Sequence, residues 1–204
     1  KEYPQAGAYG GPIHGQFETE PPPGFEKIQV FLAIRDHGQV PVRFDAENLR
    51  LPPAASLVVR RQAWLANVPP RPKLGGKLPG LLVQGDDYEP LMYLHKAGWE
   101  IWYNPTMHSY HQIPPQRFER EYLLRLARGC GLPTCHLKMI GASSTQQPGI
   151  LLKTFAGNLN RAIRHWLNHR HHLETDLAAA CEMAFHEASV MSVFFYLKRA
   201  MKLS

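Results

Sequence analysis

The sequence predicts an α/β protein, in which half of an α/β sheet is followed by helices. Short segments with strand periodicity occur near residues 57–59 and 99–103, and helical periodicity separates them. From about Leu151 onward the pattern is helical only. Because strands and helices mix without strict alternation, the pattern indicates half of an α/β sheet followed by helices. We therefore expect a sheet-bearing part followed by a helical C-terminal extension.

Size and composition are those of an ordinary soluble globular protein. The 204 residues are enough for one sizeable core, and 44% are hydrophobic while 20% are charged. No apolar run approaches the roughly 20 residues that cross a bilayer, and nothing resembles a secretory leader. The odd number and wide spacing of Cys130, Cys135 and Cys181 are typical of reduced thiols rather than zinc ligands. These features predict a cytoplasmic protein.

The formal net charge of +6 predicts a basic surface. Such a surface suits anionic partners, among them nucleotide phosphates, lipid headgroups and nucleic acids. No nucleic-acid-binding motif accompanies the charge, and aromatic residues are not interleaved with Lys and Arg in a stacking pattern. We therefore expect no nucleic-acid partner.

The first half of the chain is expected to contain few regular elements. Residues 1–24 are rich in Gly and Pro and are predicted to form loops. Helical spacing follows over 25–38, then a small-residue turn over 51–56 leads into a strand at 57–59. A helix should begin in the segment 60–65.

A second loop over 69–80 carries Arg71, Lys73 and Lys77 among Gly and Pro residues. A solvated surface loop is the simpler interpretation, and a lid that closes over phosphate is the alternative.

The middle of the chain places three carboxylates within five residues at a predicted loop-to-helix junction. Asp86, Asp87 and Glu89 precede Pro90, which fits only in the first helical turn, so the helix should begin at Asp86 or Asp87. Free N–H groups at such a junction keep an acid ionised, which makes it a candidate general base. The alternative is that these acids only cap the helix. The helix should end at Gly98, and short strands should follow over 99–103 and 107–111.

Helices are predicted for most of the remaining chain. The segment after Pro114-Pro115 is amphipathic, and its basic face is either solvated or in contact with anionic lipid or a phosphate-bearing acceptor. A last helix over 175–202 is apolar nearly all round between residues 188 and 197, so the core, a second copy of the chain or a lipid surface must cover it. His165 and His169 stand four apart before a basic cluster over 169–172, which invites a metal interpretation beside that of solvated histidines.

Several of these segments resemble a known family. The matching segments are 85–89, 97–99, 103–105 and 110–111, and together they resemble the C-terminal half of family 2 glycosyltransferases with the GT-A fold. Segments 113–117 and 122–129 are similar to the subgroup associated with cyanobacterial hormogonium and extracellular polysaccharide biosynthesis. Segment 51–61 resembles the loop and strand that line the donor sugar. The resemblance covers roughly residues 1–140 and implies the acceptor-side half of a Rossmann-like mixed sheet there, with residues 141–204 as a helical C-terminal extension.

The resemblance also implies a set of site residues. It gives Asp87 the role of catalytic base, with Asp86 in the place of a more usual Glu. The remaining assignments are donor binding by Ala54, Ala55 and Ser56, acceptor binding by Glu89 and Trp99, and a metal or diphosphate contact by His111. His108 stands three residues before His111, so on a strand the two point to opposite faces and only one can reach the cleft. A divalent cation, Mg or Mn, is expected in the complete domain.

The implied reaction is an inverting transfer of sugar from a nucleotide-sugar donor to a glycan or lipid-linked acceptor. A single base suffices, because a nucleoside diphosphate leaves more readily than the alkoxide that a glycosidase must protonate, and the cation neutralises its charge. The expected site of action is the cytoplasm, at the inner face of the plasma membrane if the basic and apolar C-terminal helices bind lipid. Association into a homo-oligomer through the last helix is also expected.

One feature of the family is absent from the sequence. The family supplies an Asp-x-Asp metal motif at the end of a strand, and the nearest equivalent, Asp45-Ala46-Glu47, has no apolar strand before it. Together with a first residue of Lys1, this predicts truncation just after the motif and poor sugar transfer by this chain alone. Two alternatives stay open. One is a non-catalytic module that binds a saccharide or a partner, and the other is a metal-dependent hydrolase built on Asp86, Asp87, Glu89, His108 and His111.

Overall fold

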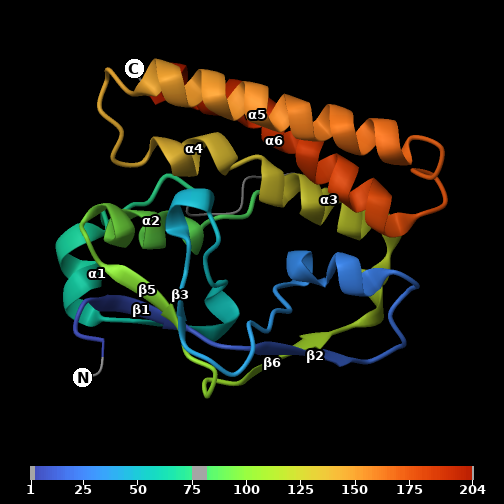
Figure 1. The fold of residues 1–204 in the computed structure, drawn as a ribbon, viewed down its shortest axis with the longest axis horizontal. Coiled ribbons are helices and arrows are strands. Elements are labelled where there is room, and N and C mark those ends of the chain that lie inside the picture. The colour runs from blue at the N-terminus through green and yellow to red at the C-terminus, as the bar shows by residue number, and fades with distance from the viewer. Residues whose placement is uncertain (1–2, 75–81, 204) are drawn as a thin grey trace.

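The computed structural model describes residues 3–74 and 82–203 of the chain, in which helices cover two small sheets (Figure 1). The larger sheet has four strands: β1 (Ala6–Gly10), β3 (Val42–Arg43), β4 (Leu57–Val59) and β5 (Glu100–Tyr103). Their order is β3-β5-β1-β4, with β1 parallel to β5 and the two outer strands antiparallel to their neighbours. The sheet is therefore mixed, and the predicted α/β class is confirmed.

The smaller sheet pairs β2 (Ile13–Phe17) with β6 (Ser109–Ile113) in parallel. The expectation that residues 1–24 form loops is wrong, because β1 and β2 lie there. Close packing explains the loop-like composition of this segment. A Cβ at Gly7 would lie 2.7 Å from Trp99 Cβ, so this central strand has no room for larger side chains.

Two helices flank the larger sheet, and both were predicted. α1 (Arg61–Asn67) follows β4, and α2 (Tyr88–Lys96) precedes β5. α2 buries Leu91 and Leu94 in a core shared with Ile101 of β5. Gly98 has a φ of 87° just beyond the helix, as expected for a C-terminal stop. The helical spacing over 25–38 corresponds to two short 3₁₀ turns, Phe25–Lys27 and Gln29–Leu32.

A layer of four helices covers the sheets (Figure 1). It consists of α3 (Arg120–Gly131), α4 (Thr134–Met139), α5 (Gln147–His169) and α6 (Leu177–Leu203). α6 packs against α3, α4 and α5. A second core joins α3 and α6 to the 3₁₀ turns through Ile28, Leu123 and Ala184. The C-terminal helices therefore pack directly on the preceding part of the chain, and the boundary at residue 140 stays a prediction.

The apolar part of α6 is covered only in part. Ser189, Ser192 and Val193 are buried, whereas Met191 and Phe194 are about half exposed. Across residues 3–74 and 82–203, no helix combines the length and the apolar character that crossing a membrane requires.

Candidate functional site

Asp87 occupies the N-cap position of α2, where the sequence predicted the helix to begin. Its Oδ1 accepts a hydrogen bond from the backbone N–H of Tyr88 at 2.9 Å. Its Oδ2 accepts one from the backbone N–H of Ala54 at 3.0 Å. The fold thus brings two of the predicted site residues, 33 positions apart in the chain, into direct contact.

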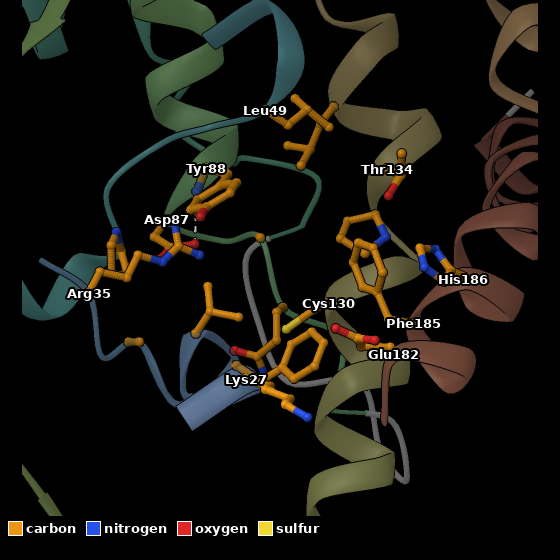
Figure 2. Close-up of a pocket in the computed structure, with 18 residues that line it drawn as sticks. Lys27, Arg35, Leu49, Asp87, Tyr88, Cys130, Thr134, Glu182, Phe185 and His186 are labelled. Carbon is orange, nitrogen blue, oxygen red and sulfur yellow. Dashed lines mark hydrogen bonds between the residues drawn. The ribbon is translucent and has the colours of Figure 1, made fainter. Parts of the chain in front are cut away.

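The Asp87 side chain lies on the wall of a cavity of about 480 Å³ (Figure 2). The wall comes from the 3₁₀ turns and the residues just after them, from Leu49 and Pro53, from the segment leading into α2, from the junction of α3 with α4, and from α6. Most of it is apolar, contributed by residues such as Val30, Phe31 and Phe185. Charged side chains reach it at a few points only: Lys27, Arg35, Asp87 and Glu182. A largely apolar cavity with few polar groups is the common form of a small-molecule site.

The surroundings of Asp87 raise the pKa of its carboxyl group, as a general base requires. Burial is the largest influence and raises the pKa of Asp87 above its ordinary value, and the neighbouring Asp86 charge raises it further. The hydrogen bonds from the backbone N–H groups of Ala54 and Tyr88 oppose this rise without cancelling it. A carboxylate with a raised pKa holds an accepted proton more firmly, which suits general-base catalysis.

Arg35 is a cavity residue that the sequence did not single out. Its Nη1 donates to the Leu51 carbonyl at 3.0 Å, and the Tyr88 hydroxyl donates to the same oxygen at 2.9 Å. Among the described residues, the buried Arg35 Nε has no hydrogen-bond partner. Its backbone bridges to Ile13, the first residue of β2. No periodicity marks this arginine, because its position depends on the pairing with a segment that the sequence predicted to be a loop.

The three residues expected to bind the donor differ in their environments. Ala54 and Ala55 are exposed, and Ala54 is the one bonded to Asp87. Ser56 is buried, and its hydroxyl accepts from the N–H of Gly11 at 3.0 Å and donates to the carbonyl of Met107 at 3.2 Å. The Ser56 hydroxyl therefore connects the ends of the strands and is already engaged by protein groups.

The other acids and the tryptophan do not join Asp87 at the cavity. Asp86 is exposed and is not part of the wall. Trp99 follows the opposite end of α2, and a nine-residue helix is about 14 Å long. Its ring packs against the core and lies 5.3 Å below the Arg60 guanidinium. The structure therefore separates Trp99 from the residue expected to activate the acceptor.

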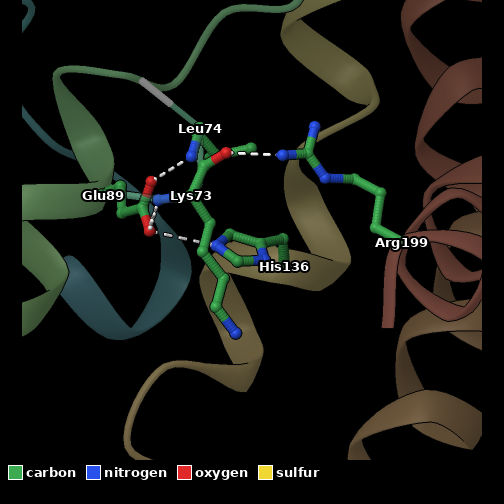
Figure 3. Close-up of polar contacts among 5 residues, drawn as sticks. All are labelled: Lys73, Leu74, Glu89, His136 and Arg199. Atoms are coloured by element: carbon green, nitrogen blue, oxygen red, sulfur yellow. Dashed lines mark hydrogen bonds and ion pairs between the residues drawn. The ribbon is translucent and has the colours of Figure 1, made fainter. Parts of the chain in front are cut away.

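Glu89, expected to bind the acceptor, is fully buried (Figure 3). Its carboxylate accepts from the backbone N–H groups of Lys73 and Leu74 and from Nε2 of His136, the last at 3.2 Å. Burial pushes the pKa of Glu89 upward, but these hydrogen bonds outweigh it, so the pKa lies below the ordinary value. The carboxylate thus binds protein groups and has no surface open to an acceptor.

These bonds also fix one end of the loop predicted over 69–80. Arg199 of α6 donates a hydrogen bond to the Lys73 carbonyl, so this point of the loop is tied to both α2 and α6. The rest of the loop from 75 onward, including Lys77, lies outside the described residues. The choice between surface loop and lid therefore stays open.

His111 is bonded through both ring nitrogens. Nδ1 lies 2.9 Å from the Leu32 carbonyl and must donate to it, so Nε2 accepts from Arg117 Nη1 at 2.9 Å. His108 bonds instead to His14, with 2.8 Å between the ring nitrogens. Within the described part of the chain, no three His, Cys, Asp or Glu residues are grouped as a metal site requires. The residues present do not fit the expected divalent cation, and the chemistry proposed below uses none.

The remaining histidines and the cysteines have protein environments of their own. His165 bonds to the Ala179 carbonyl at 2.9 Å and stacks on His169, so this pair is also engaged. The three cysteines are free thiols, as predicted. Burial raises the pKa of Cys130, which lines the cavity, to about 12, so its thiol stays protonated and is not a nucleophile.

Comparison of the chain with protein-family models, with curated proteins and with solved structures found no match. The function proposed below is therefore argued from the cavity, its residues and the resemblance in the sequence.

Proposed function

We propose that this chain carries the acceptor side of a glycosyl-transfer site, with Asp87 as its general base. The observation that carries the proposal is the position of the Asp87 carboxylate, which is fixed by two backbone N–H groups at the wall of the cavity. The resemblance of segment 85–99 to family 2 glycosyltransferases supports the same role. A positioned base with a raised pKa is what deprotonation of an alcohol near neutral pH requires.

The proposed reaction transfers a sugar with inversion at its anomeric carbon. Asp87 takes the proton of an acceptor hydroxyl while that oxygen forms a bond to the anomeric carbon. The bond from this carbon to the diphosphate oxygen breaks, and the nucleoside diphosphate leaves with the electron pair. Ala54 and Ala55, beside Asp87, allow the donor sugar to approach the backbone closely. Arg35 and Lys27 supply the positive charge that the cavity offers to an anionic group.

The character of the cavity supports an acceptor with an apolar portion. Its wall is mainly apolar, so a hydroxyl presented to Asp87 should belong to a molecule that also buries apolar surface. A lipid-linked saccharide and a glycan with an exposed sugar face both meet this condition. We place the reaction in polysaccharide biosynthesis, in the cytoplasm, on the basis of the sequence resemblance.

A non-catalytic saccharide-binding module is the second candidate function. The observation that favours it is that each Asp87 oxygen accepts a backbone hydrogen bond, which is also what a helix cap does. The metal-dependent hydrolase has less support, because Glu89 is buried and His108 and His111 are bonded to separate partners.

The two candidates are separated by comparing Asp87→Asn with Asp86→Asn in the longest form of the protein that releases nucleoside diphosphate from a nucleotide sugar. A general base contributes about 10²–10⁴-fold, so Asp87→Asn should lower kcat by that factor with little change in donor affinity. Asp86→Asn is the matched control, because it removes the adjacent, exposed charge, and it should retain most of the activity. Full activity of Asp87→Asn with an intact fold by circular dichroism would contradict the proposal and leave Asp87 only the role of a helix cap.

A further inference from the structure

The outer side of α5 carries an exposed apolar stripe. Five large residues form it, with exposed fractions between 38% and 69%: Leu152, Leu159, Ile163, Trp166 and Leu167. Their spacing places them along one side of the helix. Another side of the helix packs on the protein through Thr154, Asn158, Ala162 and His165, which are buried. Figure 1 shows α5 at the edge of the helical layer, away from the sheets.

Only positive charges accompany this stripe on its own helix. The 23 residues of α5 contain no Asp or Glu. Lys153 and Arg164 are exposed, and Arg170 follows the helix with its guanidinium 5.2 Å from the centre of the Trp166 ring. The apolar stripe is therefore bordered by cations and ends in an aromatic residue paired with one.

The neighbouring helix extends the apolar surface. Phe194 of α6 is half exposed and contacts Phe155 of α5 edge-on, with 5.9 Å between ring centres. Met191 lies one turn earlier on α6 and is also half exposed. One acid, Glu187, is exposed on this part of α6, so the cations of α5 still dominate the charge of the combined surface.

We propose that this surface, formed by the outer side of α5 with Met191 and Phe194 of α6, binds an anionic lipid bilayer. The apolar stripe would enter the boundary between headgroups and acyl chains, while Lys153, Arg164 and Arg170 contact lipid phosphates. Trp166 has the amphipathic ring that favours this interface. A second copy of the chain fits less well, because a two-fold contact would bring the acid-free faces of two α5 helices together. This inference does not depend on the proposed sugar transfer.

The test measures co-sedimentation of the chain with vesicles of phosphatidylcholine, with and without phosphatidylglycerol. We expect binding only when the anionic lipid is present, and we expect it to weaken with added salt. Equal binding to neutral and anionic vesicles, or to neither, would overturn the proposal.

Paired variants test the contribution of the apolar stripe. Leu152→Ser with Leu167→Ser should weaken binding at least about tenfold, because two apolar side chains no longer enter the bilayer. The matched control is Val40→Ser with Leu65→Ser, since both residues are 67% exposed on other parts of the molecule and should not affect binding. Unchanged binding by the α5 pair would contradict the assignment. A concentration-dependent dimer that the same pair abolishes would also overturn it and assign the surface to a second copy.

The cations are tested separately. Lys153→Gln and Arg164→Gln should each weaken binding to the anionic vesicles roughly fivefold, in line with about 1 kcal/mol for a basic residue at the membrane surface. Arg61→Gln, which removes an exposed charge on α1, is the control and should have no effect. Equal effects at all three positions would indicate a general response to net charge and would refute the location on α5.

Discussion

Asp87 and Glu89 stand two positions apart at the start of the same helix, yet their environments differ completely. Asp87 caps the helix, reaches the cavity wall and has a pKa raised by burial. Glu89 is fully buried and accepts three hydrogen bonds that outweigh the effect of burial on its pKa. The Asp87 carboxylate thus lies at the cavity, whereas the Glu89 carboxylate connects the loop at Lys73 and Leu74 to α2 and α4. The proposed catalytic role therefore falls to Asp87, and a stabilising role falls to Glu89.

Replacing Glu89 with Gln should lower the free energy of unfolding at pH 7 by about 3 kcal/mol, because it breaks a buried, charge-assisted network. The folded-state pKa is depressed, so the contribution is present above the unfolded-state pKa and is lost as the pH falls through the folded-state pKa. The difference in the free energy of unfolding between the parent protein and Glu89→Gln should therefore shrink at acid pH. Urea denaturation at several pH values measures it. Glu187→Gln, an exposed position on α6, should have almost no effect, and an equally small effect of Glu89→Gln would contradict the role assigned to this carboxylate.

At the scale of the elements, Gly129 allows α3 and residues 82–84, which lead to Asp87, to approach each other closely. A Cβ at Gly129 would overlap the Leu82 carbonyl oxygen. Two residues further along this segment, the N–H of Gln84 donates to the Gly129 carbonyl at 3.0 Å. The backbone contact between α3 and residues 82–84 thus holds the chain just before Gly85 and Asp87.

Gly129→Ala should destabilise the protein by about 2 kcal/mol, since the backbone of residues 82–84 must move to admit the new methyl group. Gly157→Ala provides the opposite control within a helix. A Cβ at Gly157 would meet nothing within 4 Å, so this substitution should stabilise α5 by up to about 1 kcal/mol. Thermal unfolding followed by circular dichroism measures both changes. Equal shifts of the midpoint temperature of unfolding in the same direction for both variants would show that the contact with Leu82 does not limit the packing of residues 82–84 on α3.

Elements with strong periodicity were predictable, and those shaped by close packing were not. α1, α2, α3, β4 and β5 follow their expected segments within a few residues. β1 was missed because its small residues, selected by tight contact with Trp99, resemble those of a loop. α4 was missed because it has only six residues directly after Pro133, too few for a periodic pattern.

For the whole molecule, the candidate site was only partly predictable. The capping role of Asp87 could be read from the acids before Pro90, and its neighbour Ala54 from the resemblance. The cavity itself is assembled from five parts of the chain, and Arg35 joins it through a pairing with residue 13. Glu182 reaches it from α6, within the predicted helical extension. No local pattern specifies such a combination, because it depends on how distant elements pack.

The most direct test of the central claim is the dependence of kcat/KM on pH for glycosyl transfer, compared between the parent protein, Asp87→Asn and Asp86→Asn. Transfer should require an ionised Asp87, so activity should fall on the acid side with a midpoint above the ordinary aspartate pKa, because burial raises the pKa of Asp87. This acid limb should persist in Asp86→Asn, with its midpoint moved slightly lower by the loss of a neighbouring negative charge. It should be absent from the residual activity of Asp87→Asn. An acid limb that is unchanged in Asp87→Asn would show that another group is the base and would contradict the account.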